Sequence, residues 1–320
     1  GTCAGYLNTT GSCNTAVGTL ALGANTTGAG NIAIGANALD SNTTAGCNIA
    51  IGFNSLQANT TGQGQIAIGG CALYNNTGSE NVAIGKESMC NTTSAETNVA
   101  IGSYSMRDAT TGNSNVAVGY CSLKANTTGA ENIAIGRCAM HVNTTGGANV
   151  STGTENAAFG RKALLTNTTG NTNTAVGVAA LQQSTTADAN TAVGFVSLIN
   201  NTTGTKNVAV GMCALSANET GTQNVAVGHA ALTASTGTGA NTAIGDDSLR
   251  GVTSGTTNTG LGINTGYAIT TGVNNLLLGA SAGRASSPSG NLTTQSNQVV
   301  LGNDSITNLW CADTSISSSD

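Results

Sequence analysis

Two histidines and one pair of adjacent aspartates are the residues of this chain whose types could support catalysis or metal binding. His141 and His229 are the only histidines, and neither has ligand-type neighbours along the chain at the spacing of a metal site. Asp246 and Asp247 form an acidic doublet, and paired carboxylates can cleave glycosidic bonds. Adjacent strand residues point to opposite sides, so we do not expect these carboxylates to share a substrate. The sequence predicts no catalytic, cofactor-binding or metal-binding residues, and no enzyme activity.

Nine cysteines offer a second kind of chemistry, but their spacing suggests no paired framework. An odd count is also atypical of a domain stapled by disulfides. Cys121 and Cys138 are 17 residues apart, yet side chains stacked in a parallel ladder are poorly oriented for a disulfide torsion. We expect free thiols that pack as small residues, consistent with assembly in a reducing cytoplasm before release.

The composition excludes several classes of protein. The 320 residues include 45 Gly, and only 7 % are charged, whereas an ordinary soluble domain carries roughly 25 %. A net charge of −5 with nine Lys and Arg argues against a nucleic-acid binder that neutralises phosphates. No apolar run reaches the roughly 18 residues of a membrane span, so we expect no membrane insertion. A thin, repetitive and extended molecule fits these bounds.

A repeat of 17 residues organises the chain. Its unit is Asn-(Ile/Val/Thr)-Ala-(Ile/Val)-Gly, two variable residues, (Ala/Ser)-(Leu/Met), two variable residues, Asn-Thr-Thr-Gly and two variable residues. Positions are counted from the first Asn. The spacing of the fifth-position glycines is 17 nearly everywhere, but 16 before Gly85, 24 before Gly160 and 23 before Gly302. These glycines are Gly18, Gly35, Gly52, Gly69, Gly85, Gly102, Gly119, Gly136, Gly160, Gly177, Gly194, Gly211, Gly228, Gly245, Gly262, Gly279 and Gly302.

Each unit predicts one coil of an all-β, parallel β-solenoid. In Asn48–Gly52, branched residues alternate with Ala50, which is the period of a short strand, and Gly52 permits a bend. Ser55-Leu56 would supply a second short apolar strand, and Asn59–Gly62 has the residues of a turn. Helical repeats need longer units and a different period, so the helical alternative is disfavoured.

Stacked coils should place equivalent residues in ladders along the axis. The first-position amides can then bond to one another, and His229 can meet Asp246 as a surface pair. We assign the second- and fourth-position Ile and Val, and the ninth-position Leu and Met, to the coil interior. The nearly invariant third-position Ala would then contact another chain. The reverse assignment would expose an apolar ladder and would also require a partner.

The repeats divide the chain into three parts. Residues 1–250 carry regular repeats, interrupted by an irregular insertion at 146–155 that we interpret as a half-coil or protruding loop. Residues 251–302 carry degenerate repeats with a loop at 284–297, and residues 303–320 form a C-terminal tail. Trp310, in this tail, is expected to close the end of the assembly.

Two stretches resemble known families. Asn-Val-Ala-Ile-Gly at 81–85 and 98–102 resembles the head repeat of YadA-like trimeric adhesins, which implies a left-handed parallel β-roll with three chains around one axis. The longer unit with Asn-Thr-Thr-Gly is more similar to repeats of viral and phage tail fibres. Residues 298–320 resemble the stretch before an endosialidase-type intramolecular chaperone, here missing. That resemblance implies a processing junction at Ser319-Asp320.

The resemblance implies a parallel homotrimer in a virion tail fibre or on an extracellular surface. Such a fibre segment would be a rigid shaft that attaches to a host polysaccharide or protein, without a cofactor. We expect surface contacts at Phe53, Tyr104, Tyr120 and Phe195, which lie just after the repeat glycines. The alternatives are the head of a bacterial adhesin and, less favoured because aromatics and paired carboxylates are scarce, a polysaccharide-degrading tailspike.

Overall fold

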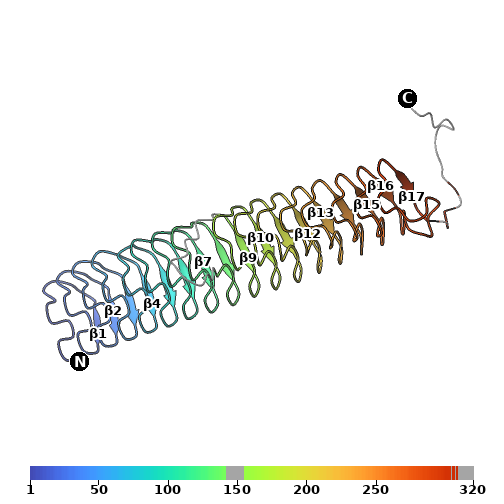
Figure 1. Cartoon of the computed structure of the whole chain (residues 1–320). Helices are drawn as coiled ribbons and strands as arrows, with labels where there is room; N and C mark the ends of the chain where they lie inside the picture. Colours follow the sequence, from blue (N-terminus) through green and yellow to red (C-terminus); the bar gives the residue numbers. More distant parts are fainter. Residues whose placement is uncertain (142–154, 304, 307, 309–320) are drawn as a thin grey trace.

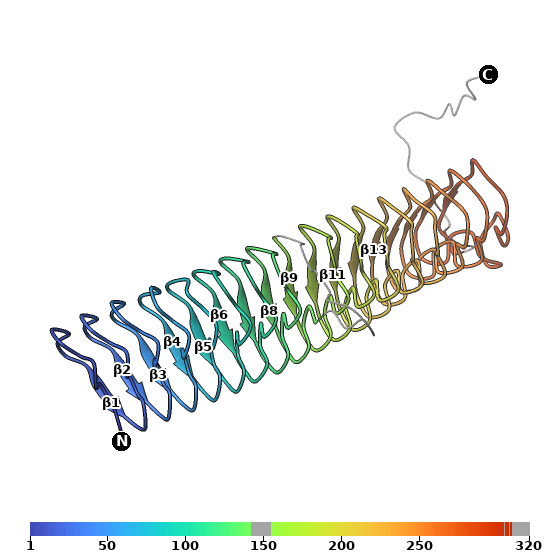
Figure 2. The same ribbon diagram turned by 60° about the vertical axis from the view of Figure 1, so that its left-hand side comes forward.

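The computed structural model describes residues 1–141, 155–303, 305, 306 and 308, which build one long stack of coils. Figures 1 and 2 show the strands in a single row along a rod, with β1 and β17 at its two ends. The described residues contain no helix and 17 strands of three residues. The strands are Thr15–Val17 (β1), Ile32–Ile34 (β2), Ile49–Ile51 (β3), Ile66–Ile68 (β4), Val82–Ile84 (β5), Val99–Ile101 (β6), Val116–Val118 (β7), Ile133–Ile135 (β8), Ala157–Phe159 (β9), Thr174–Val176 (β10), Thr191–Val193 (β11), Val208–Val210 (β12), Val225–Val227 (β13), Thr242–Ile244 (β14), Thr259–Leu261 (β15), Leu276–Leu278 (β16) and Val299–Leu301 (β17).

Each strand pairs in parallel with the next strand along the chain, as a β-solenoid requires. Third-position residues pair with one another, as Ala33 of β2 does with Ala50 of β3. The irregular spacings leave this register intact, because β4 still pairs with β5, β8 with β9 and β16 with β17. The prediction of an all-β parallel solenoid with coils of about 17 residues is confirmed. The predicted half-coil or loop at 146–155 falls almost wholly outside the described residues.

The interior of each coil is narrow and is filled from two sides. Third-position alanines such as Ala83 and ninth-position residues such as Met89 are fully buried. The second- and fourth-position residues of β5, Val82 and Ile84, remain partly exposed instead. Our assignment of Ile and Val to the interior and of Ala to another chain is therefore wrong. Leu and Met reach in from the opposite wall and occupy the space, which leaves room only for a methyl group from the strand.

Only one strand forms in each coil, so the predicted second strand at Ser55-Leu56 is also wrong. Leu56 has a φ of 49°, and Asn54, two residues before it, has a φ of 55°. This left-handed backbone is unfavourable for a branched residue by about 1–2 kcal/mol. It persists because each such residue is held by its neighbours, as when the Leu56 N–H donates to the Ala72 carbonyl at 3.0 Å. The kink turns the Leu side chain into the coil.

The fifth-position glycine is required both by the backbone and by the close approach of the next coil. Gly35 has a φ of 135°, which is outside the regions open to other residues. A Cβ atom there would lie 2.5 Å from the carbonyl oxygen of Gly52 in the next coil. The column of glycines that reveals the repeat in the sequence is thus the column where successive coils touch most closely.

The degenerate repeats keep the interior filled by exchanging large and small residues. Leu277 of β16 replaces the third-position Ala and is fully buried. The ninth-position residues next to it are Gly266 and Gly283, in place of Leu. A Cβ atom on Gly283 would lie 2.4 Å from Cδ2 of Leu277. The interior is therefore filled from the strand side at this end of the rod and from the turn side elsewhere.

Polar ladders run beside the apolar interior, as the sequence predicts. The Nδ2 group of the twelfth-position Asn42 donates to Oδ1 of Asn25 at 2.9 Å, and both residues are buried. The Thr26 hydroxyl donates to the Thr43 carbonyl at 3.0 Å. The Asn25 and Asn42 amides belong to Asn-Thr-Thr sequences, so their burial supports our interpretation of these asparagines as turn residues rather than glycan acceptors.

Candidate functional site

The residues with catalytic potential are paired with one another on the surface of the rod. Nδ1 of His229 lies 2.8 Å from Oδ1 of Asp246, and both side chains are about half exposed. Asp247 contacts Arg250 instead, at 3.0 Å, so the two carboxylates have separate partners. In the described part of the chain, no group of three or more His, Cys, Asp and Glu residues could hold a metal ion. The predicted surface pair is confirmed.

The eight cysteines of the described ranges are all free, including Cys121 and Cys138 on adjacent coils. Burial raises the pKa of the Cys90 thiol to about 11, with a smaller contribution from Cys71. A thiol with such a pKa is protonated at neutral pH and is a poor nucleophile. These observations agree with the prediction of thiols that act as small packing residues.

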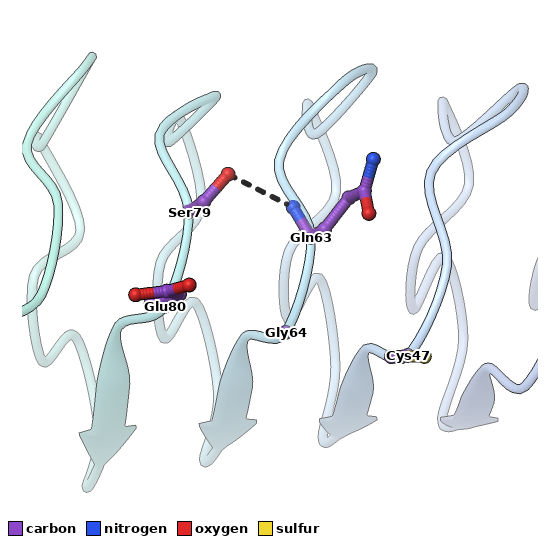
Figure 3. A pocket seen from close by; sticks show the side chains of 5 residues that line it. All are labelled: Cys47, Gln63, Gly64, Ser79 and Glu80. Carbon is purple, nitrogen blue, oxygen red and sulfur yellow. Dashed lines mark hydrogen bonds between the residues drawn. The ribbon is translucent and has the colours of Figure 1, made fainter.

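A hollow on the side of the coil that precedes the strands also lacks reactive groups that face one another. It is lined by Cys47, Gln63, Gly64, Ser79 and Glu80. Figure 3 shows Cys47 and Glu80 on coils separated by the coil of Gly64, with the Ser79 hydroxyl accepting a hydrogen bond from the Gln63 backbone N–H at 3.2 Å. The thiol and the carboxylate come from coils too far apart to act as a nucleophile and its base.

The four predicted contact residues lie in three places on the rod. Phe53 follows β3 and Phe195 follows β11, and their exposed fractions are 59 % and 53 %. Tyr104 follows β6 and Tyr120 follows β7, so these two tyrosines come from adjacent coils. Their ring centroids are 5.8 Å apart and the ring planes meet at 87°, an edge-to-face pair. Stacking alone does not align them, because Tyr104 is at the seventh position of its unit and Tyr120 at the sixth. The predicted processing junction at Ser319-Asp320 and Trp310 lie outside the described residues.

Cations surround this pair of tyrosines, and we call the whole group the tyrosine cluster. The Lys86 ammonium and the Arg107 guanidinium lie 5.7 and 5.8 Å from the centre of the Tyr104 ring. The Arg137 guanidinium lies 5.7 Å from the centre of the Tyr120 ring. A cation at this distance is attracted by the electrons of the ring face. The cluster consists of Lys86, Glu87, Tyr104, Arg107, Asp108, Tyr120, Cys121, Lys124 and Arg137.

The backbone ladder holds the cluster in place. The Tyr104 N–H donates to the Lys86 carbonyl at 2.9 Å, and the Cys138 N–H donates to the Tyr120 carbonyl at 2.9 Å. A surface hollow of about 280 Å³ lies among Glu87, Tyr104, Arg107, Tyr120, Cys121 and Lys124. The cluster thus combines aromatic rings, cations and a carboxylate around one concave surface.

Electrostatics keep the cluster cationic and its tyrosines neutral. A hydrogen bond with Tyr104, followed by the charges of Tyr104 and Glu87, raises the pKa of Lys86. A hydrogen bond with Cys121 raises the pKa of Tyr120. At neutral pH the ammonium therefore stays charged, and the phenol can donate a hydrogen bond.

Sequence reasoning identified the tyrosines but missed the cations. The signal was available in the repeat, because Tyr120 and Arg137 are one unit apart, as are Arg107 and Lys124. Counted in the same way, eight of the nine Lys and Arg residues occupy the sixth, seventh or tenth position of a unit. They are Lys86, Arg107, Lys124, Arg137, Arg161, Lys162, Arg250 and Arg284.

The strand face carries a second surface feature, a continuous apolar strip. We define this apolar strip as the second- and fourth-position residues of β1–β17. The fourth position is apolar in every strand, and exposed fractions of 38 % at Ile34, Ile101 and Ile135 are typical. The strip is made by the row of parallel strands in Figure 2. Thr occupies only some of the second positions, so the strip is apolar along the whole rod.

Comparison of this chain with models of protein families and with curated proteins finds no match. Within the described residues, no helix is long and apolar enough to cross a bilayer.

Proposed function

We propose that this chain is a segment of a trimeric, non-enzymatic tail fibre, which serves as a rigid shaft and attaches a phage or virus to the host surface. The observation that carries the proposal is the apolar strip. Soluble monomers rarely expose contiguous apolar patches larger than a few hundred Å². This strip runs past all 17 strands on a rod that is otherwise polar outside, so contact between copies is the simplest way to cover it.

The number of copies and the hand of the coil follow from the resemblance of the repeats to YadA-like heads. Three copies arranged as a left-handed parallel β-roll would bring their apolar strips to a common axis. Each copy would contribute the same face, and a closed ring of three leaves no strip uncovered. The corrected inside-out arrangement of Ala and Ile favours this packing, because the branched side chains are available for contact.

The ladders support the mechanical role. Every coil is bonded to the next through the strand, the buried asparagines and the threonine loops, so bending would strain many hydrogen bonds together. Attachment would use the side chains that project from the shaft, above all the tyrosine cluster. The head of a bacterial adhesin would have the same architecture. The segment that follows the tail in the complete gene product distinguishes the two, since a fibre needs a chaperone and an adhesin needs a membrane anchor.

Sedimentation equilibrium tests the proposal. The chain has a mass of 31.2 kDa, and the expected species has three times that mass at micromolar concentration. A stable folded monomer would overturn the proposal, because a single copy would then tolerate its exposed strip.

A further inference from the structure

The tyrosine cluster concentrates positive charge on an acidic protein. The chain carries a net charge of −5, yet Lys86, Arg107, Lys124 and Arg137 meet around two rings. The two carboxylates of the cluster are already engaged. Glu87 lies 3.7 Å from Lys86 and 3.4 Å from Arg107, and Asp108 lies 3.7 Å from Arg107. Arg137, on the far side of the pair, stacks on Tyr120. The cluster therefore offers more cations than its own carboxylates neutralise.

The rings and the charges together fit a saccharide that carries a carboxylate. The polarised C–H groups on one face of a sugar ring are attracted to the electron-rich face of a tyrosine. Arg and Lys bind a carboxylate through charge-assisted hydrogen bonds. Glu87 and the tyrosine hydroxyls can accept hydrogen bonds from sugar hydroxyls. All of these groups border the same hollow.

Nucleic acid fits the cluster less well. Aromatic rings beside cations can also hold single-stranded DNA or RNA, but such binding follows a basic groove over several nucleotides. Glu87 and Asp108 lie within the cluster and would repel phosphates, whereas Glu87 can serve the hydroxyls of a sugar. A neutral sugar would leave the excess cations without a purpose.

We propose that the tyrosine cluster is a binding site for an acidic polysaccharide, in which a carboxylate-bearing sugar stacks on Tyr104 or Tyr120 and its carboxylate contacts Arg107, Lys124 or Arg137. The inference rests on the proposed attachment function and names the class of receptor for it. The site lies on the turn that follows the strand and uses none of the residues of the apolar strip, so it is compatible with assembly.

Calorimetric titration of the full chain tests the site. The acidic probes are polymannuronate, polygalacturonate and hyaluronan fragments. The comparison probes are dextran, which is neutral, polyglutamate, which is acidic without sugar rings, and oligo(dT). Binding of at least one acidic polysaccharide, in clear preference to all three comparison probes, is expected. No binding to any acidic polysaccharide would overturn the inference, and so would equal or tighter binding of dextran, polyglutamate or oligo(dT).

Substitutions then locate the site. Tyr120→Ala and Arg107→Ala should each weaken binding about tenfold, because each removes a ring or a cation from the hollow. The matched controls are Phe195→Ala, which removes an equally exposed ring, and Lys206→Ala, which removes a cation outside the cluster. Controls that weaken binding as much as the cluster variants would overturn the inference.

Sedimentation of the same samples separates the two proposals. Trimers that fail to bind any acidic polysaccharide would remove the binding site and leave the fibre proposal standing. Folded monomers would remove the fibre proposal, whatever they bind.

Discussion

Asn48 donates its backbone N–H to Oδ1 of Asn31, the residue one unit earlier, at 3.1 Å, and both residues are fully buried. The same bond recurs from coil to coil along the rod, as between Asn98 and Asn81 at 3.0 Å. A first-position amide thus caps the backbone of the next coil before its strand begins. The position requires a side chain that can accept and donate at once, which Asn and Gln provide.

Replacement of one amide in this ladder should destabilise the fold strongly. Asn98→Ala removes the acceptor for the Asn115 N–H at 2.8 Å and the donor to the Gly112 carbonyl at 3.0 Å. Each buried group left without a partner costs about 1–3 kcal/mol. We expect a loss of about 3 kcal/mol in urea unfolding at fixed chain concentration. Asn75→Ala, at an exposed position, is the control and should change stability by less than about 0.5 kcal/mol.

The glycine column should not tolerate even one methyl group. Gly85 has a φ of 136°, and a Cβ atom there would lie 2.5 Å from the carbonyl carbon of Gly102. Gly85→Ala should therefore cost about 3 kcal/mol or more in thermal or urea unfolding, from strain and overlap together. Gly64→Ala is the matched control, since its φ is 63° and the nearest atom to the new Cβ atom would be 3.8 Å away. Equal losses for both variants would contradict the close contact of the coils.

The exchange of large and small residues at β16 predicts a compensating pair of substitutions. Leu277→Ala should leave a cavity and cost about 2–5 kcal/mol. Gly266→Leu should restore part of that loss in the double variant, because Gly266 has a φ of 58°, close to the 47° of Leu249 in the same column. A double-mutant cycle measured by urea unfolding gives the coupling between the two sites. Additive losses would show that the two residues do not share one volume.

Charges placed on the apolar strip should dissociate the assembly without unfolding the coils. Ile101→Lys and Ile135→Lys put an ammonium on the strand face, where both native side chains are 38 % exposed in the single chain. Burial of an unpaired charge between copies is costly, so sedimentation should give smaller species. Thr111→Lys adds the same charge to an exposed loop of the coil that holds Ile101, and its sedimentation should match the unmodified protein.

Cys90 should react slowly with alkylating agents. Burial, the largest cause, holds its pKa near 11, above the model value of 9.0, so the thiolate forms only in strongly alkaline solution. The raised pKa favours the folded state at pH values below about 9, and this contribution is lost as the pH rises towards 11. Mass spectrometry after iodoacetamide treatment at pH 8 should find Cys47, which is exposed, labelled well before Cys90. Equal labelling would show that Cys90 opens freely to solvent.

The sequence alone determined the repeat, the parallel stack and the ladders. A unit length held at 17 residues forces equivalent positions into register, so the pairing of His229 with Asp246 and of Asn48 with Asn31 could be read by counting. The same counting could have paired Tyr120 with Arg137, since it needs no knowledge of side-chain direction.

The tertiary structure alone decided which face of the strand points inward. An alternation such as Ile49-Ala50-Ile51 has a period of two, and that pattern is equally consistent with either face inside. The decision comes from the opposite wall, where Leu56 adopts a φ of 49° and turns its side chain into the coil. Once that volume is occupied, only the Ala50 methyl group fits beneath the strand, and the isoleucines are left outside, available to a neighbouring copy.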